Sequence, residues 1–221
     1  MKEIIPAIVA ADRDDFFMKI KKVGAAAATI HIDVMDGVFV PERAWADPEA
    51  IAAMHMPYQI EAHFMVTDPV AAARVWIAAG AAQRIIPHAE ALGWHEAWTL
   101  GQRAGVEVGV AVNPDTAIAE IADAIAEISV VLVMGVHPGR SGQPLEPHIV
   151  QKIHALHQRY PALMIEVDGG VHLRTAPALA AAGASRLIAA SALFGEKNFS
   201  EAFRALVQAA SSEDALRGMI Q

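Results

Sequence analysis

The stretch His31-Ile32-Asp33-Val34-Met35-Asp36-Gly37 decides how this chain is interpreted. Side chains alternate between the two faces of a β-strand, so His31, Asp33 and Met35 share one face and the branched apolar residues share the other. A histidine and an aspartate on a buried strand cost free energy unless something pairs with them. Gly37 indicates that the strand then ends in a loop. In an α/β enzyme, such strand ends are where the chemistry is placed.

Apolar strand-like runs alternate with amphipathic helical patterns along the whole chain. Strands are expected at residues 4–10, 28–34, 59–66, 84–88, 107–112, 130–136, 163–168 and 186–190. Helical patterns lie near 13–23, 47–55, 69–79, 93–104, 116–127, 146–159, 174–182 and 199–210. The strands are rich in valine and isoleucine and mostly apolar on both faces, which is typical of buried parallel strands.

Eight β-α units in 221 residues average about 28 residues each, close to a compact TIM (β/α)8 barrel. No linker or change of composition divides the chain, so we expect a single catalytic domain over residues 1–221. An open, doubly wound sheet is the alternative. It is disfavoured because no Gly-x-Gly-x-x-Gly follows the first strand.

The composition limits the classes of function. The chain is 54% hydrophobic with a mean hydropathy of +0.32, yet no apolar run is long enough to cross a membrane. It contains no cysteine, and its start lacks a signal-peptide pattern, so a cytoplasmic protein is expected. The net charge of −8 argues against nucleic acid as the main partner and leaves a small anionic substrate open.

Polar side chains recur at three predicted strand ends. His63 shares a face with Glu61 and Met65, and Asp168 shares a face with Glu166. Inward residues near the carboxyl ends of barrel strands converge on one mouth, and there they would bring together His31, Asp33, His63 and Asp168. Each alone is more simply a satisfied core histidine or an ion-paired aspartate. All four together predict one divalent metal ion, such as Zn²⁺, Fe²⁺, Mn²⁺ or Co²⁺.

A second constellation predicts phosphate binding. Glycine-rich turns after the last three strands can present backbone N–H groups to an anion. Their residues are Gly139, Arg140, Ser141, Gly142, Gly169, Gly170, Ala190 and Ser191. Three inward methionines, Met35, Met65 and Met134, are either core filler or an apolar lining of the mouth. His88 could also reach the mouth. The histidines assigned to the surface are those on helical or loop segments, His55, His95, His148, His154, His157 and His172.

The chain resembles the ribulose-phosphate 3-epimerase family, in family order over nearly its whole length. The matching pieces are Pro6-Ala7-Ile8-Val9-Ala10-Ala11-Asp12, the 31–37 stretch continued by Val38-Phe39-Val40-Pro41, His63-Phe64-Met65-Val66, Pro138-Gly139-Arg140-Ser141-Gly142-Gln143, Glu166-Val167-Asp168-Gly169-Gly170-Val171 and Ala190-Ser191-Ala192-Leu193-Phe194. The His-x-Asp-x-Met-Asp-Gly block is highly specific.

The resemblance implies a metal held by His31, Asp33, His63 and Asp168, with Asp33 and Asp168 as the acid/base pair. Removal of the C3 proton of a 2-ketose leaves a negatively charged enediolate, and two carboxylates on opposite sides are the minimum for inversion. The substrate would contact His63, the three methionines and the glycine-rich turns. The resemblance also implies a place in carbohydrate metabolism, in the pentose phosphate pathway.

Several positions depart from the family pattern. Ala7 and Ala10 replace serines, and Arg140-Ser141 stands where Phe-Gly is usual. His137 is often Asn, Asp or Glu. Ala190 replaces a glycine, which is tolerable only if its φ is negative. The reaction type is therefore expected to be kept, while the substrate could have drifted.

The first hypothesis is a metal-dependent phosphoketose 3-epimerase that interconverts D-ribulose 5-phosphate and D-xylulose 5-phosphate. We expect it to assemble as a homo-oligomer, such as a dimer or hexamer. A ketohexose 6-phosphate (allulose 6-phosphate type) epimerase is the close alternative. A lyase of the orotidine-phosphate-decarboxylase group is disfavoured because the 33–36 stretch has no lysine. A non-catalytic sugar-phosphate-binding barrel is the remaining alternative.

Overall fold

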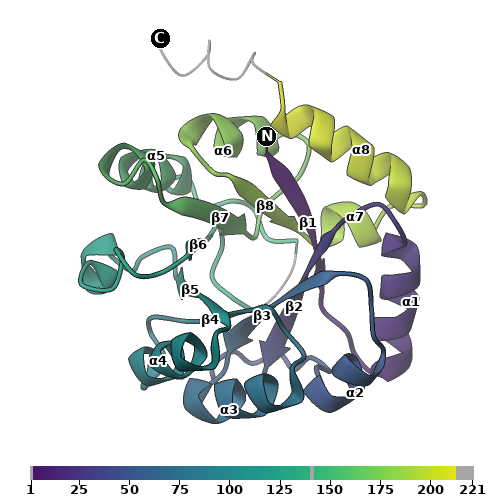
Figure 1. The fold of residues 1–221 in the computed structure, drawn as a ribbon. Coiled ribbons are helices and arrows are strands. Elements are labelled where there is room, and N and C mark those ends of the chain that lie inside the picture. The colour runs from purple at the N-terminus through teal and green to yellow at the C-terminus, as the bar shows by residue number, and fades with distance from the viewer. Residues whose placement is uncertain (1, 140–141, 213–221) are drawn as a thin grey trace.

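The protein is a closed barrel of eight parallel strands surrounded by helices, as Figure 1 shows for the computed structural model. The structure describes residues 2–139 and 142–212. Neighbouring strands pair in sequence order, and β8 closes the barrel against β1. The strands are β1 (Glu3–Ile8), β2 (Thr29–Met35), β3 (Gln59–Met65), β4 (Arg84–Pro87), β5 (Glu107–Val112), β6 (Val130–Met134), β7 (Met164–Asp168) and β8 (Arg186–Ala189). The predicted TIM barrel is confirmed.

The helices form the outer layer of the barrel. They are α1 (Arg13–Val23), α2 (Pro48–Ala53), α3 (Pro69–Ala79), α4 (Trp94–Ala104), α5 (Ile149–Arg159), α6 (Ala176–Ala182), α7 (Ser191–Phe194) and α8 (Phe199–Ala210). Two begin with the same Asp-Pro signal, in which Asp47 and Asp68 each accept a backbone N–H three residues on. Within the described ranges, no helix is long and apolar enough to cross a membrane.

The prediction of an α-helix near 116–127 is wrong. That segment forms a short 3₁₀ helix, Ile118–Ile121, followed by turns with bonds between residues three apart, such as Ala124 N–H to Ile121 O at 3.1 Å. Ile121, Ala124 and Ile128 are buried on one side of these turns. The apolar spacing was therefore real, but three-residue turns satisfy it as well as an α-helix does.

Two cores meet at the strands. The larger one lies between the barrel and the helices, and a smaller one fills the barrel interior with residues such as Ile5, Ile86, Leu132 and Ile188. The interior also holds charge. At the start of the strands, Glu61 pairs in register with Arg84 on β4, and Glu166 pairs with Arg186 on β8. Metal-compatible side chains follow two residues later, at the carboxyl ends of β2, β3 and β7.

Candidate active site

Four side chains from three strands converge at the carboxyl end of the barrel. His31 and Asp33 come from β2, His63 from β3 and Asp168 from β7. One ligand atom from each lies within 4.8 Å of the other three. His63 Nδ1 is 3.0 Å from Asp33 Oδ1 and 3.9 Å from Asp168 Oδ2. Strand alternation explains why all four point inward, because residues two apart share a face.

His31 presents an unsatisfied nitrogen to this cluster. Its Nδ1 lies 2.7 Å from Glu61 Oε1, so the Nδ1–H group donates a hydrogen bond to this carboxylate. Its Nε2 is buried and has no hydrogen-bond partner, although Asp33 Oδ1 lies 3.3 Å away. A buried lone pair of this kind fits a metal ligand whose orientation is fixed by an outer carboxylate. The donor set of two imidazoles and two carboxylates is likewise suited to a divalent metal.

His63 also has an outer partner. Its Nε2 lies 2.9 Å from His88 Nε2, and His88 Nδ1 lies 2.9 Å from Glu90 Oε2. Glu90 in turn accepts the backbone N–H of Asn113 at 2.7 Å and the hydroxyl of Thr116. From its place at a strand end, His88 was expected to reach the mouth of the barrel. It is instead fully buried beside His63.

The two aspartates have opposite pKa shifts. Burial opposes ionisation of Asp33, but the neighbouring His31 and His63 bring its pKa well below the usual range. Burial, together with the nearby charge of Asp33, raises the pKa of Asp168 to about 7. Burial lowers the pKa of His63 to about 4. The site thus pairs a carboxylate that ionises readily with a second that holds a proton more tightly.

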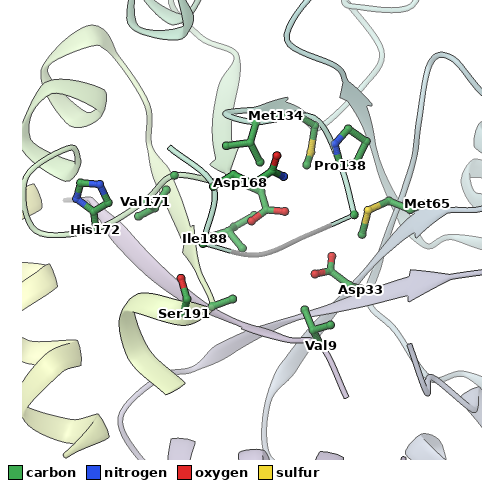
Figure 2. Close-up of a pocket in the computed structure, with 17 residues that line it drawn as sticks. Val9, Asp33, Met65, Met134, Pro138, Asp168, Val171, His172, Ile188 and Ser191 are labelled. Carbon is green, nitrogen blue, oxygen red and sulfur yellow. The ribbon is translucent and has the colours of Figure 1, made fainter. Parts of the chain in front are cut away.

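The pocket above this cluster is shown in Figure 2. The carboxylates of Asp33 and Asp168 point toward each other across it, with Met65 and Met134 beside them. Its lining also includes Gly139, Gly142, Gly169, Gly170, Ala190 and Ser191, all residues expected from the sequence. Val9, Val136, Pro138, Gln143, Val171, His172 and Ile188 complete the lining and were not expected.

Other expected contacts lie elsewhere. His31 and His63 are fully buried beneath the pocket, and Met35 packs against Val40 and Met65 outside its lining. Ala7, buried at 1% exposure, lies in the barrel interior. Arg140 and Ser141 fall outside the described residues.

Two histidines near the pocket differ from what the sequence suggested. His172 is half-buried and lines the pocket, which corrects its assignment to the surface. The sequence did contain a signal for this position. His172 follows Gly170 by two residues, and residues just after the carboxyl end of a barrel strand lie at the mouth of the barrel. His137 lies 3.3 Å from Asp115 and its side chain is 57% exposed. It is therefore oriented to the loop after β5, and it is not part of the pocket lining.

The turn after β7 depends on its glycines. Gly169 and Gly170 have φ values of +94° and +69°, in the region that L side chains rarely adopt. A Cβ on Gly170 would also lie 2.8 Å from Leu145 Cα. After the neighbouring strand β8, Ala190 has φ −105°, so the alanine in place of the family glycine does not have to adopt the left-handed region.

Comparisons with known proteins show the class of this chain, an isomerase of the epimerase type that acts on carbohydrates. Residues 3–194 match the Ribulose-phosphate 3 epimerase family. Ribulose-phosphate 3-epimerase from Chlamydia trachomatis serovar D is 36% identical over 201 residues, covering 86% of this chain and 85% of that protein. The cytoplasmic isoform of the enzyme from Oryza sativa subsp. japonica is 32% identical over 211 residues, covering 92% of each chain. The chain belongs to the ribulose-phosphate 3-epimerase family.

Solved structures support the same fold. The 3-keto-L-gulonate-6-phosphate decarboxylase from Vibrio cholerae superimposes with a TM-score of 0.72 over 95% of this chain and 98% of its own. The identity is only 16%, so this likeness shows the barrel alone.

Proposed function

We propose that the chain is a metal-dependent ketose-phosphate 3-epimerase that interconverts D-ribulose 5-phosphate and D-xylulose 5-phosphate. One observation carries the proposal: the carboxylates of Asp33 and Asp168 face each other across the pocket from β2 and β7 (Figure 2). Inversion at a carbon beside a carbonyl needs a base on one side and an acid on the other. The substrate would lie between them with its C3 hydrogen directed at one carboxylate.

The two carboxylates are suited to different starting roles. Asp33, with its lowered pKa, is ionised at neutral pH and can accept the C3 proton. Burial and the charge of Asp33 raise the pKa of Asp168, so of the two carboxylates it holds a proton more tightly and is suited to return one to the opposite face. Reaction in the reverse direction exchanges the roles. Environments that separate the pKa values of two neighbouring carboxylates are a known basis for acid/base assignments.

The metal site is the second part of the proposal. His31, Asp33, His63 and Asp168 would hold one divalent ion, Zn²⁺, Fe²⁺, Mn²⁺ or Co²⁺. A bound ion supplies positive charge where negative charge develops on the substrate oxygens. The protein's own contribution is to fix the ligand atoms from β2, β3 and β7 before substrate enters.

The substrate's phosphate would bind on the other side of the pocket. Gly169, Gly170 and Ser191 line that side, and the turn after β7 needs both of its glycines to keep its backbone conformation. Backbone N–H groups in such turns bind phosphate without a basic side chain. This agrees with an acidic protein acting on an anionic sugar. By analogy with the rice isoform, we place the reaction in the cytoplasm.

Turnover on a panel of sugar phosphates tests the substrate. With metal bound, kcat/KM for D-ribulose 5-phosphate should exceed that for a ketohexose 6-phosphate such as allulose 6-phosphate by at least about tenfold. The reverse order would assign the chain to the hexose phosphate. No turnover of either sugar by the metal-loaded protein would overturn the epimerase proposal and favour a binding role.

A further inference from the structure

His88 and Glu90 lie behind the proposed metal site and touch neither the pocket nor the four ligand atoms. They form a chain of close contacts that begins at His63. His63 Nε2 and His88 Nε2 are 2.9 Å apart, and the two ring planes differ by only 23°. With the rings nearly parallel and these two nitrogens at hydrogen-bond distance, an N–H of one ring can be directed at the lone pair of the other. His88 Nδ1 continues the chain to Glu90 Oε2 at 2.9 Å.

The outer end of the chain sets the direction of its hydrogen bonds. The other oxygen of Glu90 already accepts the Asn113 N–H and the Thr116 hydroxyl, so the carboxylate acts as an acceptor. An ionised carboxylate cannot donate, and His88 Nδ1 must therefore carry the proton between them. A neutral His88 then has a lone pair on Nε2, and His63 Nε2 must donate to it.

This arrangement of protons also determines the state of His63 Nδ1, the nitrogen that faces the two aspartates. With its proton on Nε2, neutral His63 has a lone pair on Nδ1. That nitrogen faces Asp33 Oδ1 at 3.0 Å and Asp168 Oδ2 at 3.9 Å. A lone pair directed at carboxylate oxygens is unfavourable by itself and becomes favourable when a cation lies between them. The surroundings add support, because both rings are fully buried and Phe39 packs against His88 with ring centroids 5.0 Å apart.

We propose that His88 and Glu90 are positioning residues, which hold His63 in the tautomer protonated at Nε2 and so keep Nδ1 free to bind the metal. The inference rests on the metal site of the proposed function. It adds a second outer partner to the one at His31, where Glu61 accepts the Nδ1 proton and leaves Nε2 free. Each ligand histidine is thereby oriented from behind, one by a carboxylate and the other through a second imidazole.

Glu90→Gln is the most informative variant because it should reverse the direction of the hydrogen bonds that run from residue 90 through His88 to His63. The Asn113 N–H can only donate, so the carbonyl oxygen of the new amide is expected to take the place of Oε1. Its NH₂ group then faces His88 Nδ1 and donates to it. His88 must carry its proton on Nε2, and His63 must accept there and carry its own proton on Nδ1. The metal-binding nitrogen is blocked with almost no change of shape.

Thr116→Val is the matched control. It removes one hydrogen bond to Glu90 and perturbs the same loop, but it leaves the carboxylate and its bond to His88 in place. A role of Glu90 that is only structural, through this loop, would be impaired in both variants. A role in fixing the tautomer would be impaired only in Glu90→Gln.

Zn²⁺ affinity, measured by competition with a chelator in the absence of substrate, is the test. We expect Glu90→Gln to weaken Zn²⁺ binding about 10–100-fold and Thr116→Val to weaken it less than about threefold. Nitrogen-15 NMR of the histidine rings should place the His63 proton on Nε2 in the Zn²⁺-loaded wild type. In zinc-free Glu90→Gln it should lie on Nδ1.

Three outcomes would overturn the inference. They are unchanged Zn²⁺ affinity in Glu90→Gln, equal losses in both variants, or a His63 proton on Nδ1 in the loaded wild type. A wild-type protein that binds no Zn²⁺ would instead overturn the metal site itself, and the inference with it. His88→Phe, which removes the imidazole acceptor at similar size, should reproduce the loss seen in Glu90→Gln if it folds.

Discussion

Inside the barrel, Arg84 Nη1 lies 2.8 Å from Glu61 Oε2, while the other oxygen of Glu61 contacts His31 Nδ1 at 2.7 Å. One carboxylate thus links the charged layer at the start of the strands to the proposed metal site. Glu61 has 1% of its side chain exposed. Arg84 also reaches Glu166 across the barrel at 3.3 Å, so the layer is a connected network.

Removing Glu61 should therefore lower the free energy of unfolding much more than removing one partner of a surface ion pair does. Glu61→Leu leaves buried positive charge on Arg84 less compensated, and loss of one partner of a buried pair typically destabilises by about 3–5 kcal/mol. Glu107 provides the control, because it also binds Arg84, at 2.6 Å, but its side chain is 60% exposed. Glu107→Gln should cost about 0–1 kcal/mol. Urea unfolding near neutral pH measures both, and similar values for the two variants would contradict the network.

Asp36 should make the folded state sensitive to acid. It accepts the backbone N–H groups of Val38 and Phe39 and both donors of Thr67, and so joins the loops after β2 and β3. Partial burial opposes ionisation, but these bonds lower the pKa of Asp36 from 3.8 to about 2. A lowered pKa stabilises the fold above the unfolded value, and that contribution is lost as pH falls through the folded value.

The measurement is the difference in unfolding free energy between wild type and Asp36→Asn. The wild type should be more stable near neutral pH, and the difference should shrink as pH falls from about 4 to about 2. Other acidic groups titrate in both proteins and cancel. A difference that stays constant over this interval would show that the charge of Asp36 does not hold the loops.

The turn after β7 should not tolerate a side chain at Gly170. Gly170 and Gly80 have similar φ values, +69° and +64°, but a Cβ on Gly80 meets nothing within 4 Å while one on Gly170 meets Leu145. Gly80→Ala should cost about 1–2 kcal/mol from the left-handed conformation alone. Gly170→Ala adds the steric contact, so it should cost more and also raise KM. Equal costs in thermal or urea unfolding would contradict the close packing.

The sequence was sufficient for the barrel and for the convergence of the four side chains proposed to bind the metal. Period-two alternation along β2, β3 and β7 decides which side chains point inward, and parallel strands bring their carboxyl ends together. His31, Asp33, His63 and Asp168 could therefore be predicted as neighbours before any coordinates.

What lies behind the ligands could not be predicted in the same way. Alternation places Glu61 and Arg84 inward, but it does not show that adjacent strands put them in register and in contact. The link from His63 through His88 to Glu90 depends on ring orientations that no spacing encodes. The 116–127 segment failed for a similar reason, because apolar residues at intervals of three and four suit both an α-helix and successive 3₁₀ turns.

The central claim is that Asp33 and Asp168 move the C3 proton between the two faces of the sugar. Epimerisation of D-ribulose 5-phosphate in deuterated water tests it most directly, with metal content measured for each protein. We expect the wild type to place deuterium at C3 of the product. Asp33→Asn and Asp168→Asn, each saturated with metal, should lose conversion by at least about 10²-fold. Conversion near the wild-type rate in either variant, or product without deuterium at C3, would contradict the two-carboxylate account.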